Sequence, residues 1–157
     1  MGSQWPGMGQ QLMEIPLFDN FLKESSETLK EFGLDVYGML KNSDPEQYKS
    51  TLNCMLAIII ALTDLLCAID IQPDGILGHS TGEMGCGYAD GALTRAQTMR
   101  LAYYRGATIM AKREKMREAM AAVESQWDED LALHCSADYH VNNACSPVLF
   151  YDMLTQQ

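Results

Sequence analysis

One serine in this sequence has the surroundings of a covalent catalyst. Residues 78–82, Gly-His-Ser-Thr-Gly, fit the pattern G-x-S-x-G, in which a sharp turn between a strand and a helix exposes a serine oxygen. A short apolar strand is predicted over Gly75–Leu77, and helical sequence follows the turn. The turn would place Ser80 at a helix N-terminus, where backbone N–H groups, here that of Thr81, stabilise negative charge. The alternative is a glycine-rich turn whose serine only caps the helix.

Arg105 is the second residue with chemical potential, because a guanidinium can bind a carboxylate through two parallel hydrogen bonds. No acidic residue lies one helical turn away, so we expect no local ion pair to neutralise its charge. Its neighbours at that spacing are Leu101, Ala102, Thr108 and Ile109. A surface or interdomain arginine explains the same pattern equally well.

The segment after the serine is rich in glycine, which weakens a helix by about 1 kcal/mol per residue relative to alanine. Gly82, Gly85 and Gly87 all fall within it. A sequence tolerates this cost where backbones pack closely, so we expect a helix buried against a sheet. Cys86 is expected to be a small packing residue.

Two helical regions precede the serine. A helix is predicted over residues 16–32, with Gly33 just past its end. A second helical region opens at Asp44-Pro45 and runs into an apolar helix that ends near Cys67. The apolar run is too short for a membrane span and contains Asp64, so we expect a core helix.

Another helix is predicted to start at Thr94, and Thr94 and Gln97 would together form a capping box. Its core-facing stripe would consist of Met99, Tyr103, Gly106 and Met110. Further along, the sequence predicts a strand over Ala121–Val123, a helix around residues 127–133 and an apolar run over Val148–Tyr151. The alternation of helices and strands predicts an α/β fold.

Composition limits the possible functions. The chain has 157 residues and a net charge of −10, which argues against a general nucleic-acid binder. Seven of its eleven cations lie within residues 95–117. The five cysteines have no metal-type spacing and no secretory signal precedes them, so we expect reduced thiols, a cytoplasmic location and no metal site.

Several segments together resemble the malonyl/acetyltransferase domain of animal-type fatty acid synthase. The resemblance rests on residues 78–83 and 87–91, and the acyltransferases of polyketide synthases share the core pattern. The other matching segments are residues 1–5, 7–9, 73–76, 103–106 and 120–123. The resemblance implies a partial α/β-hydrolase-like acyltransferase core over residues 1–119. It also implies the start of a small ferredoxin-like subdomain over residues 120–157.

The resemblance also implies a reaction and its residues. Ser80 would take a malonyl or acetyl group from coenzyme A and pass it to the phosphopantetheine thiol of an acyl carrier protein. Arg105 would pair with the malonyl carboxylate, and Gln4 and His79 would belong to the substrate site. The backbone amide of Thr81 and the backbone nitrogen of Met1, here a terminal amine, would form the oxyanion hole. No bound cofactor is implied beyond the coenzyme A thioester and the phosphopantetheine.

The sequence departs from this family pattern in two places. The catalytic histidine of the family lies well downstream of the arginine, and the sequence stops at Gln157 before that point. Neither His134 nor His140 lies in the catalytic histidine motif. The first core strand of the family would precede Met1. We therefore expect a fragment of a domain whose partners are acyl-CoA donors, an acyl carrier protein and the other domains of a homodimeric synthase, with no nucleic acid and no membrane span.

Two other functions stay open at this point. A serine thioester hydrolase would use the same G-x-S-x-G turn but gives no role to Arg105. A non-catalytic fragment could instead dock an anionic carrier protein or coenzyme A phosphates through the basic residues 95–117. A solvated helix face explains those basic residues better.

Overall fold

The computed structural model describes residues 5–43, 51–113, 118–124, 140–142 and 148–154. The chain divides into two compact units, Met1–Thr108 and Ile109–Gln157. The predicted division into residues 1–119 and 120–157 stays a prediction.

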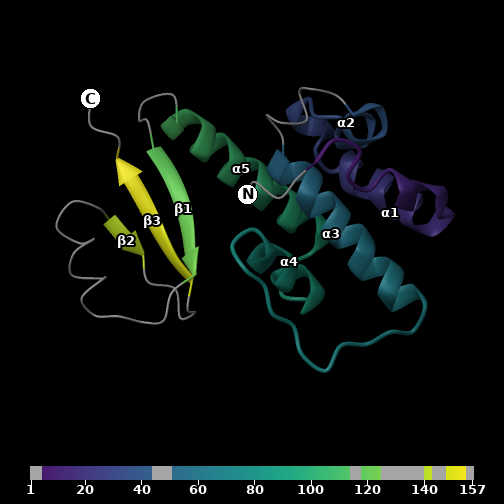
Figure 1. Ribbon diagram of the computed structural model, residues 1–157. Coiled ribbons are helices and arrows are strands. Elements are labelled where there is room, and N and C mark those ends of the chain that lie inside the picture. Colours follow the sequence, from purple (N-terminus) through teal and green to yellow (C-terminus); the bar gives the residue numbers. More distant parts are fainter. Residues whose placement is uncertain (1–4, 44–50, 114–117, 125–139, 143–147, 155–157) are drawn as a thin grey trace. The chain divides into compact units, whose positions relative to one another are not determined.

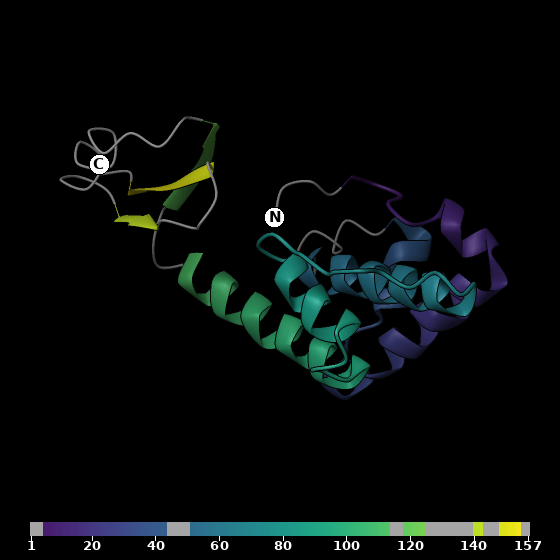
Figure 2. The same cartoon turned by 90° about the horizontal axis from the view of Figure 1, so that it is seen from below.

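The described part of the first unit is built from helices. Short 3-10 helices η1 (Gln11–Glu14) and η2 (Lys30–Phe32) flank α1 (Pro16–Glu27). They are followed by α2 (Val36–Asn42), α3 (Thr51–Ala68), α4 (Gly82–Ala89) and α5, which begins at Arg95 and runs to Arg113. Helix α3 contacts α1, α2 and α4, so it is the central element (Figures 1 and 2).

Helix α3 is the predicted apolar helix, and it ends at Ala68, next to the predicted end at Cys67. Its length and hydropathy would suffice to cross a membrane, but half of that stretch is buried inside the molecule. Leu56 and Ile60 are fully buried, and Phe18 of α1 and Met99 of α5 belong to the same core. Because its apolar side chains are buried against these helices, α3 is a core helix, as predicted.

The helix predicted over residues 16–32 is shorter in the structure. Helix α1 ends at Glu27, and the Thr28 hydroxyl donates to the carbonyl of Ser25 at 2.7 Å. The chain then tightens into η2, which Gly33 closes with a left-handed φ of 72°. The prediction was wrong about continuity because a local side-chain bond competes with the helical ladder. It was right about the terminating glycine.

Helix α2 was missed by the sequence prediction. Asp35 caps it, since its carboxylate accepts a hydrogen bond from the backbone N–H of Gly38 at 3.0 Å. An aspartate before an apolar pair is an N-cap signal that could have revealed this helix. The helical region predicted to open at Asp44-Pro45 begins outside the described residues.

The start of α5 confirms the predicted capping box. Thr94 N–H donates to Gln97 Oε1 at 2.8 Å, and Gln97 N–H donates to Thr94 Oγ1 at 3.3 Å. Met99 is buried as predicted, whereas Met110 is 38% exposed and the prediction for it was wrong. Gly106, one turn before Met110, still lies against Leu52 of α3.

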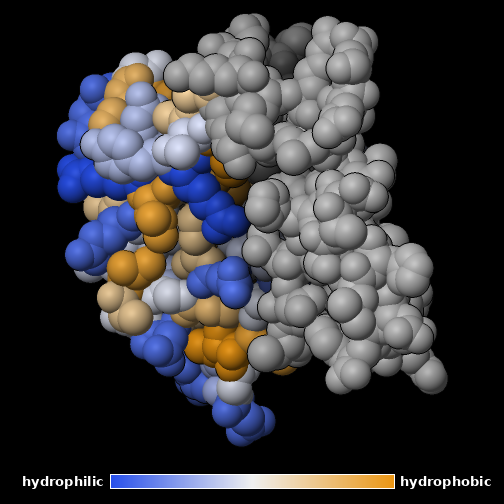
Figure 3. All heavy atoms as spheres, turned by 90° about the vertical axis from the view of Figure 1, so that its left-hand side faces the viewer, coloured by the Kyte–Doolittle hydropathy of each residue, from blue (hydrophilic) through white to orange (hydrophobic). Residues whose placement is uncertain are grey.

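The strand predicted over Gly75–Leu77 is not formed. Residues 71–79 have no regular structure and are exposed, and Leu77 is 94% exposed. A strand requires a neighbour to complete its hydrogen bonds, and no strand occurs among the described residues of the first unit. Ile69, Ile71 and Ile76 are also exposed. Figure 3 shows one face of the molecule, where apolar side chains lie between hydrophilic ones.

The second unit holds a three-stranded antiparallel sheet in the order β1-β3-β2. Its strands are β1 (Glu118–Glu124), β2 (His140–Asn142) and β3 (Val148–Leu154). In the register, Tyr151 of β3 pairs with Ala121 of β1 and Val141 of β2. The predicted strand over Ala121–Val123 is confirmed, and the apolar run over Val148–Tyr151 lies in β3. The helix predicted around residues 127–133 falls outside the described residues.

Candidate active site

Ser80 occupies a strained turn immediately before α4. Its φ of 55° lies in the left-handed region, which residues other than glycine adopt uncommonly. Backbone hydrogen bonds close the turn: Gly82 N–H donates to the His79 carbonyl at 2.9 Å, and Glu83 N–H donates to the Ser80 carbonyl at 3.2 Å. Such strain persists where the surroundings enforce it, and it is typical of active sites. The predicted sharp turn is confirmed, with Ser80 half-buried within it.

The two glycines of the turn, Gly78 and Gly82, have different surroundings. A Cβ atom at Gly78 would lie 2.6 Å from the carbonyl carbon and oxygen of Gly82 and 2.6 Å from Cys86 Sγ. Only glycine therefore fits at position 78. A Cβ atom at Gly82 would meet nothing within 4 Å, so the predicted steric reason does not apply there. Cys86 packs against the turn, as expected of a small packing residue.

Helix α4 is held close to its neighbours by its other glycines. A Cβ at Gly85 would lie 2.7 Å from Cγ2 of Ile59 on α3, and one at Gly87 would lie 3.0 Å from Cδ1 of Leu93. The predicted close packing is confirmed. The partner at Gly85 is a helix and not the predicted sheet, because α3 occupies the position beside α4.

A polar network that sequence reasoning missed ties α4 and α5 to α3. Tyr88 Oη donates to Asp64 Oδ1 at 2.6 Å, and Arg95 Nη2 donates to Asp64 Oδ2 at 2.7 Å. Arg95 also pairs with Glu24 and donates to the carbonyl of Phe21 at 3.3 Å. Burial, together with the hydrogen bond to Asp64, raises the pKa of Tyr88. A charged residue in an otherwise apolar helix was the available signal for this network.

Arg105 lies on α5 and is exposed. Among the described residues it forms no hydrogen bond or ion pair, whereas Arg95 pairs with Asp64 and Arg100 with Glu31 at 2.7 Å. The basic stretch is therefore neutralised in part within the protein. Arg105 remains available to an anionic ligand, as its uncharged neighbours predicted.

Among the predicted site residues that the structure describes, His79 and Thr81 share the turn with Ser80, and Arg105 lies on α5. Met1, Gln4 and His134 lie outside the described residues. His140 begins β2 in the second unit, while His79 sits in the turn itself and is exposed. Within the described ranges, no group of three His, Cys, Asp or Glu side chains could hold a metal ion.

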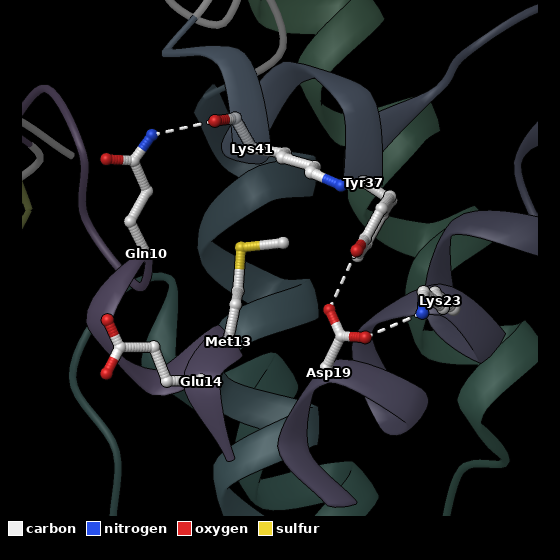
Figure 4. A pocket seen from close by; sticks show the side chains of 7 residues that line it. All are labelled: Gln10, Met13, Glu14, Asp19, Lys23, Tyr37 and Lys41. Atoms are coloured by element: carbon white, nitrogen blue, oxygen red, sulfur yellow. Dashed lines mark hydrogen bonds and ion pairs between the residues drawn. The ribbon is translucent and has the colours of Figure 1, made fainter. Parts of the chain in front are cut away.

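A pocket of about 500 Å³ opens elsewhere on the first unit, between η1, α1 and α2 (Figure 4). Asp19 accepts a hydrogen bond from the Tyr37 hydroxyl at 2.8 Å and pairs with Lys23 at 2.6 Å. The bond to Lys23 lowers the pKa of Asp19. The residues that line the pocket are Gln10, Met13, Glu14, Asp19, Lys23, Tyr37 and Lys41. None of them is a predicted site residue, so we do not assign this pocket to acyl chemistry.

The chain is similar in sequence to known proteins. Residues 1–133 match the acyl transferase domain family. The chain is 35% identical, over 152 residues, to the highly reducing polyketide synthase SAT13 of Stachybotrys chartarum. That match covers 92% of this chain and 6% of the synthase. The predicted resemblance is confirmed for the acyltransferase domain, but this relative is a polyketide synthase and not an animal-type fatty acid synthase.

Two solved structures have a similar fold. The acyltransferase domain of the polyketide synthase PpsC of Mycobacterium tuberculosis has a TM-score of 0.79 and 26% identity, covering 97% of this chain and 47% of that one. An acyl carrier protein S-malonyltransferase from Vibrio cholerae has a TM-score of 0.77 and 25% identity, covering 96% and 53%. The chain therefore spans about half the length of these solved proteins, and the fold fits an α/β acyltransferase.

Proposed function

Because the chain belongs to the acyl transferase domain family, we propose that it transfers malonyl or acetyl groups from coenzyme A to an acyl carrier protein. The observation that carries the proposal is the strained Ser80 turn at the start of α4. The name of the Vibrio cholerae malonyltransferase supports the choice of acyl group and carrier.

In the proposed reaction the Ser80 hydroxyl oxygen attacks the thioester carbonyl. Its proton passes to a general base and then to the sulfur of coenzyme A, which leaves as the thiol. The thiol of the carrier protein next attacks the acyl-serine ester, and the serine oxygen recovers a proton. The backbone N–H of Thr81 at the start of α4 would stabilise the tetrahedral oxyanion, with the backbone nitrogen of Met1 as the second donor.

Arg105 is proposed to select malonyl over acetyl groups. A malonyl thioester carries a free carboxylate, and a guanidinium fork binds a carboxylate through two hydrogen bonds. The exposed position of Arg105 and its lack of partners among the described residues support this role. Gln4 and His79 would contribute to the same substrate site.

We also propose that the acyltransferase works within a larger synthase in the cytoplasm. The fungal relative favours a polyketide synthase, and the sequence resemblance to animal fatty acid synthase keeps fatty acid synthesis as the alternative. The partners would be acyl-CoA donors, the acyl carrier protein and the other domains of a homodimeric synthase.

Loading with radiolabelled malonyl-CoA and acetyl-CoA tests the proposal. We expect Arg105→Ala to lower malonyl loading of Ser80 about tenfold or more and to leave acetyl loading unchanged, because charged hydrogen bonds are lost. Arg100→Ala is the control, since this arginine lies on the same helix but pairs with Glu31. Equal effects of both variants would contradict the specificity role. Release of free malonate without carrier loading would instead indicate a hydrolase.

A further inference from the structure

Asp64 is a single carboxylate that holds two helices at once. Its Oδ1 accepts from Tyr88 near the end of α4, and its Oδ2 accepts from Arg95 at the start of α5. The side chains of Asp64 and Arg95 are only 18% and 19% exposed. Solvent therefore screens this pair less than an exposed one. When the pair is broken, Arg95 keeps only its contacts with Glu24 and the Phe21 carbonyl of α1.

The two helices held by Asp64 carry the two proposed functional residues. Ser80 lies in the turn that leads into α4, eight residues before Tyr88. Arg105 lies on α5, ten residues after Arg95. Ten residues of helix span about 15 Å, so a small rotation at the start of α5 becomes a larger displacement at Arg105.

We propose that Asp64 is a positioning residue that sets the distance between Ser80 and Arg105 and thereby the preference for malonyl groups. This inference rests on the proposed function. Reacting groups must be held within about 0.5 Å of a productive geometry, which requires supporting residues with fixed positions. The bond to Tyr88 fixes α4, and the bond to Arg95 fixes α5.

Two substitutions separate the two bonds. In Asp64→Asn the amide oxygen can still accept from Tyr88, but the amide NH₂ faces the guanidinium of Arg95, and two donors cannot bond. In Tyr88→Phe the bond to α4 is lost and the ion pair with Arg95 remains. Glu31→Gln is the matched control, because it removes the exposed ion pair that Arg100 makes from the same helix.

The first readout is the ratio of malonyl to acetyl loading on Ser80. We expect Asp64→Asn to lower this ratio about tenfold, since a misplacement of about 1 Å can cost a hundredfold in rate. A purely structural role would lower both rates in parallel with the folded fraction and leave the ratio unchanged. Glu31→Gln should leave the ratio at the wild-type value.

The second readout does not need acyl transfer. Spin labels on ketone-bearing unnatural amino acids at Glu83 of α4 and Leu101 of α5 avoid the native cysteines and report the distance between the helices. We expect the distance distribution to shift or broaden in Asp64→Asn and in Tyr88→Phe but not in Glu31→Gln.

The outcomes separate the two proposals. If folded Asp64→Asn keeps the wild-type distance distribution, the positioning role is overturned. A changed distance with an unchanged loading ratio overturns the link to selectivity. If the wild-type protein does not acylate Ser80, the proposed function fails, while the distance measurement still decides whether Asp64 positions the two helices.

Discussion

Replacing Gly85 with alanine tests how closely the helix that follows the serine is packed. The new Cβ would lie 2.7 Å from Ile59 Cγ2, short of the 3.4 Å at which ordinary contact begins. Helix α4 or the Ile59 side chain must therefore move by about 0.7 Å to relieve the overlap. Any movement of α4 is transmitted to Ser80, which lies at its start.

The expected effect combines two opposing contributions to stability. Alanine in place of glycine favours a helix by about 1 kcal/mol, whereas overpacking a core costs about 1–3 kcal/mol. We expect Gly85→Ala to lower the free energy of unfolding by up to about 2 kcal/mol, with the steric contribution dominant. Malonyl loading of Ser80 should slow about tenfold, because the nucleophile is displaced.

A double-mutant cycle isolates the steric contact. In an Ile59→Ala background the obstructing methyl group is gone, so Gly85→Ala should raise the free energy of unfolding by about 1 kcal/mol. Urea denaturation followed by circular dichroism of the helices measures all four proteins. Gly82→Ala is the control, since its Cβ would meet nothing within 4 Å. It should keep the helical gain and raise the free energy of unfolding by up to about 1 kcal/mol. A stabilising Gly85→Ala in the wild-type background would refute the reasoning.

Three further predictions concern the cap of α5, the titration of Tyr88 and the burial of Cys54. Thr94→Ala should cost about 1 kcal/mol of stability in urea denaturation through loss of the capping box, whereas Thr108→Ala, which removes only a hydroxyl bonded within α5, should not. An equal loss in both would contradict the cap. The pKa of Tyr88 is raised above 10.0 in the folded protein. The free energy of unfolding that this shift contributes is complete below a pH of about 10.0 and is lost as the pH rises through the folded-state pKa. Tyr88→Phe should therefore lose less stability in alkaline urea denaturation than wild type, and an identical alkaline profile would argue against the shift. Burial raises the pKa of Cys54 to about 12, so iodoacetamide at mildly alkaline pH should label exposed Cys67 and spare Cys54, as peptide mass spectrometry would show. Equal labelling would disprove the burial.

The sequence was informative where structure depends on near neighbours. Thr94 and Gln97 are three residues apart, so their capping box could be recognised from spacing alone. Gly33 ends a helical segment because its own backbone adopts a left-handed φ. The Ser80 turn likewise depends on residues within one short segment.

Interactions between distant segments could not be predicted. Asp64 and Arg95 are separated by 31 residues, and nothing in their local spacing indicates that they form an ion pair. The run Gly75–Leu77 has apolar strand composition, but a strand exists only beside another strand, and a single segment does not reveal its neighbour. Arg105 could be proposed as a ligand-binding residue, because the sequence shows that no acidic residue lies one helical turn away. The identity of its ligand could not be predicted from residue spacing.

Mass spectrometry of the peptide that contains Ser80, after incubation of the protein with malonyl-CoA, tests the central claim most directly. The proposed function predicts one malonyl group on Ser80, none on that peptide in Ser80→Ala, and loss of the label when acyl carrier protein with a free phosphopantetheine thiol is added. An unmodified Ser80 in the folded protein, or the same label in Ser80→Ala, would contradict the claim that Ser80 forms the acyl-enzyme ester.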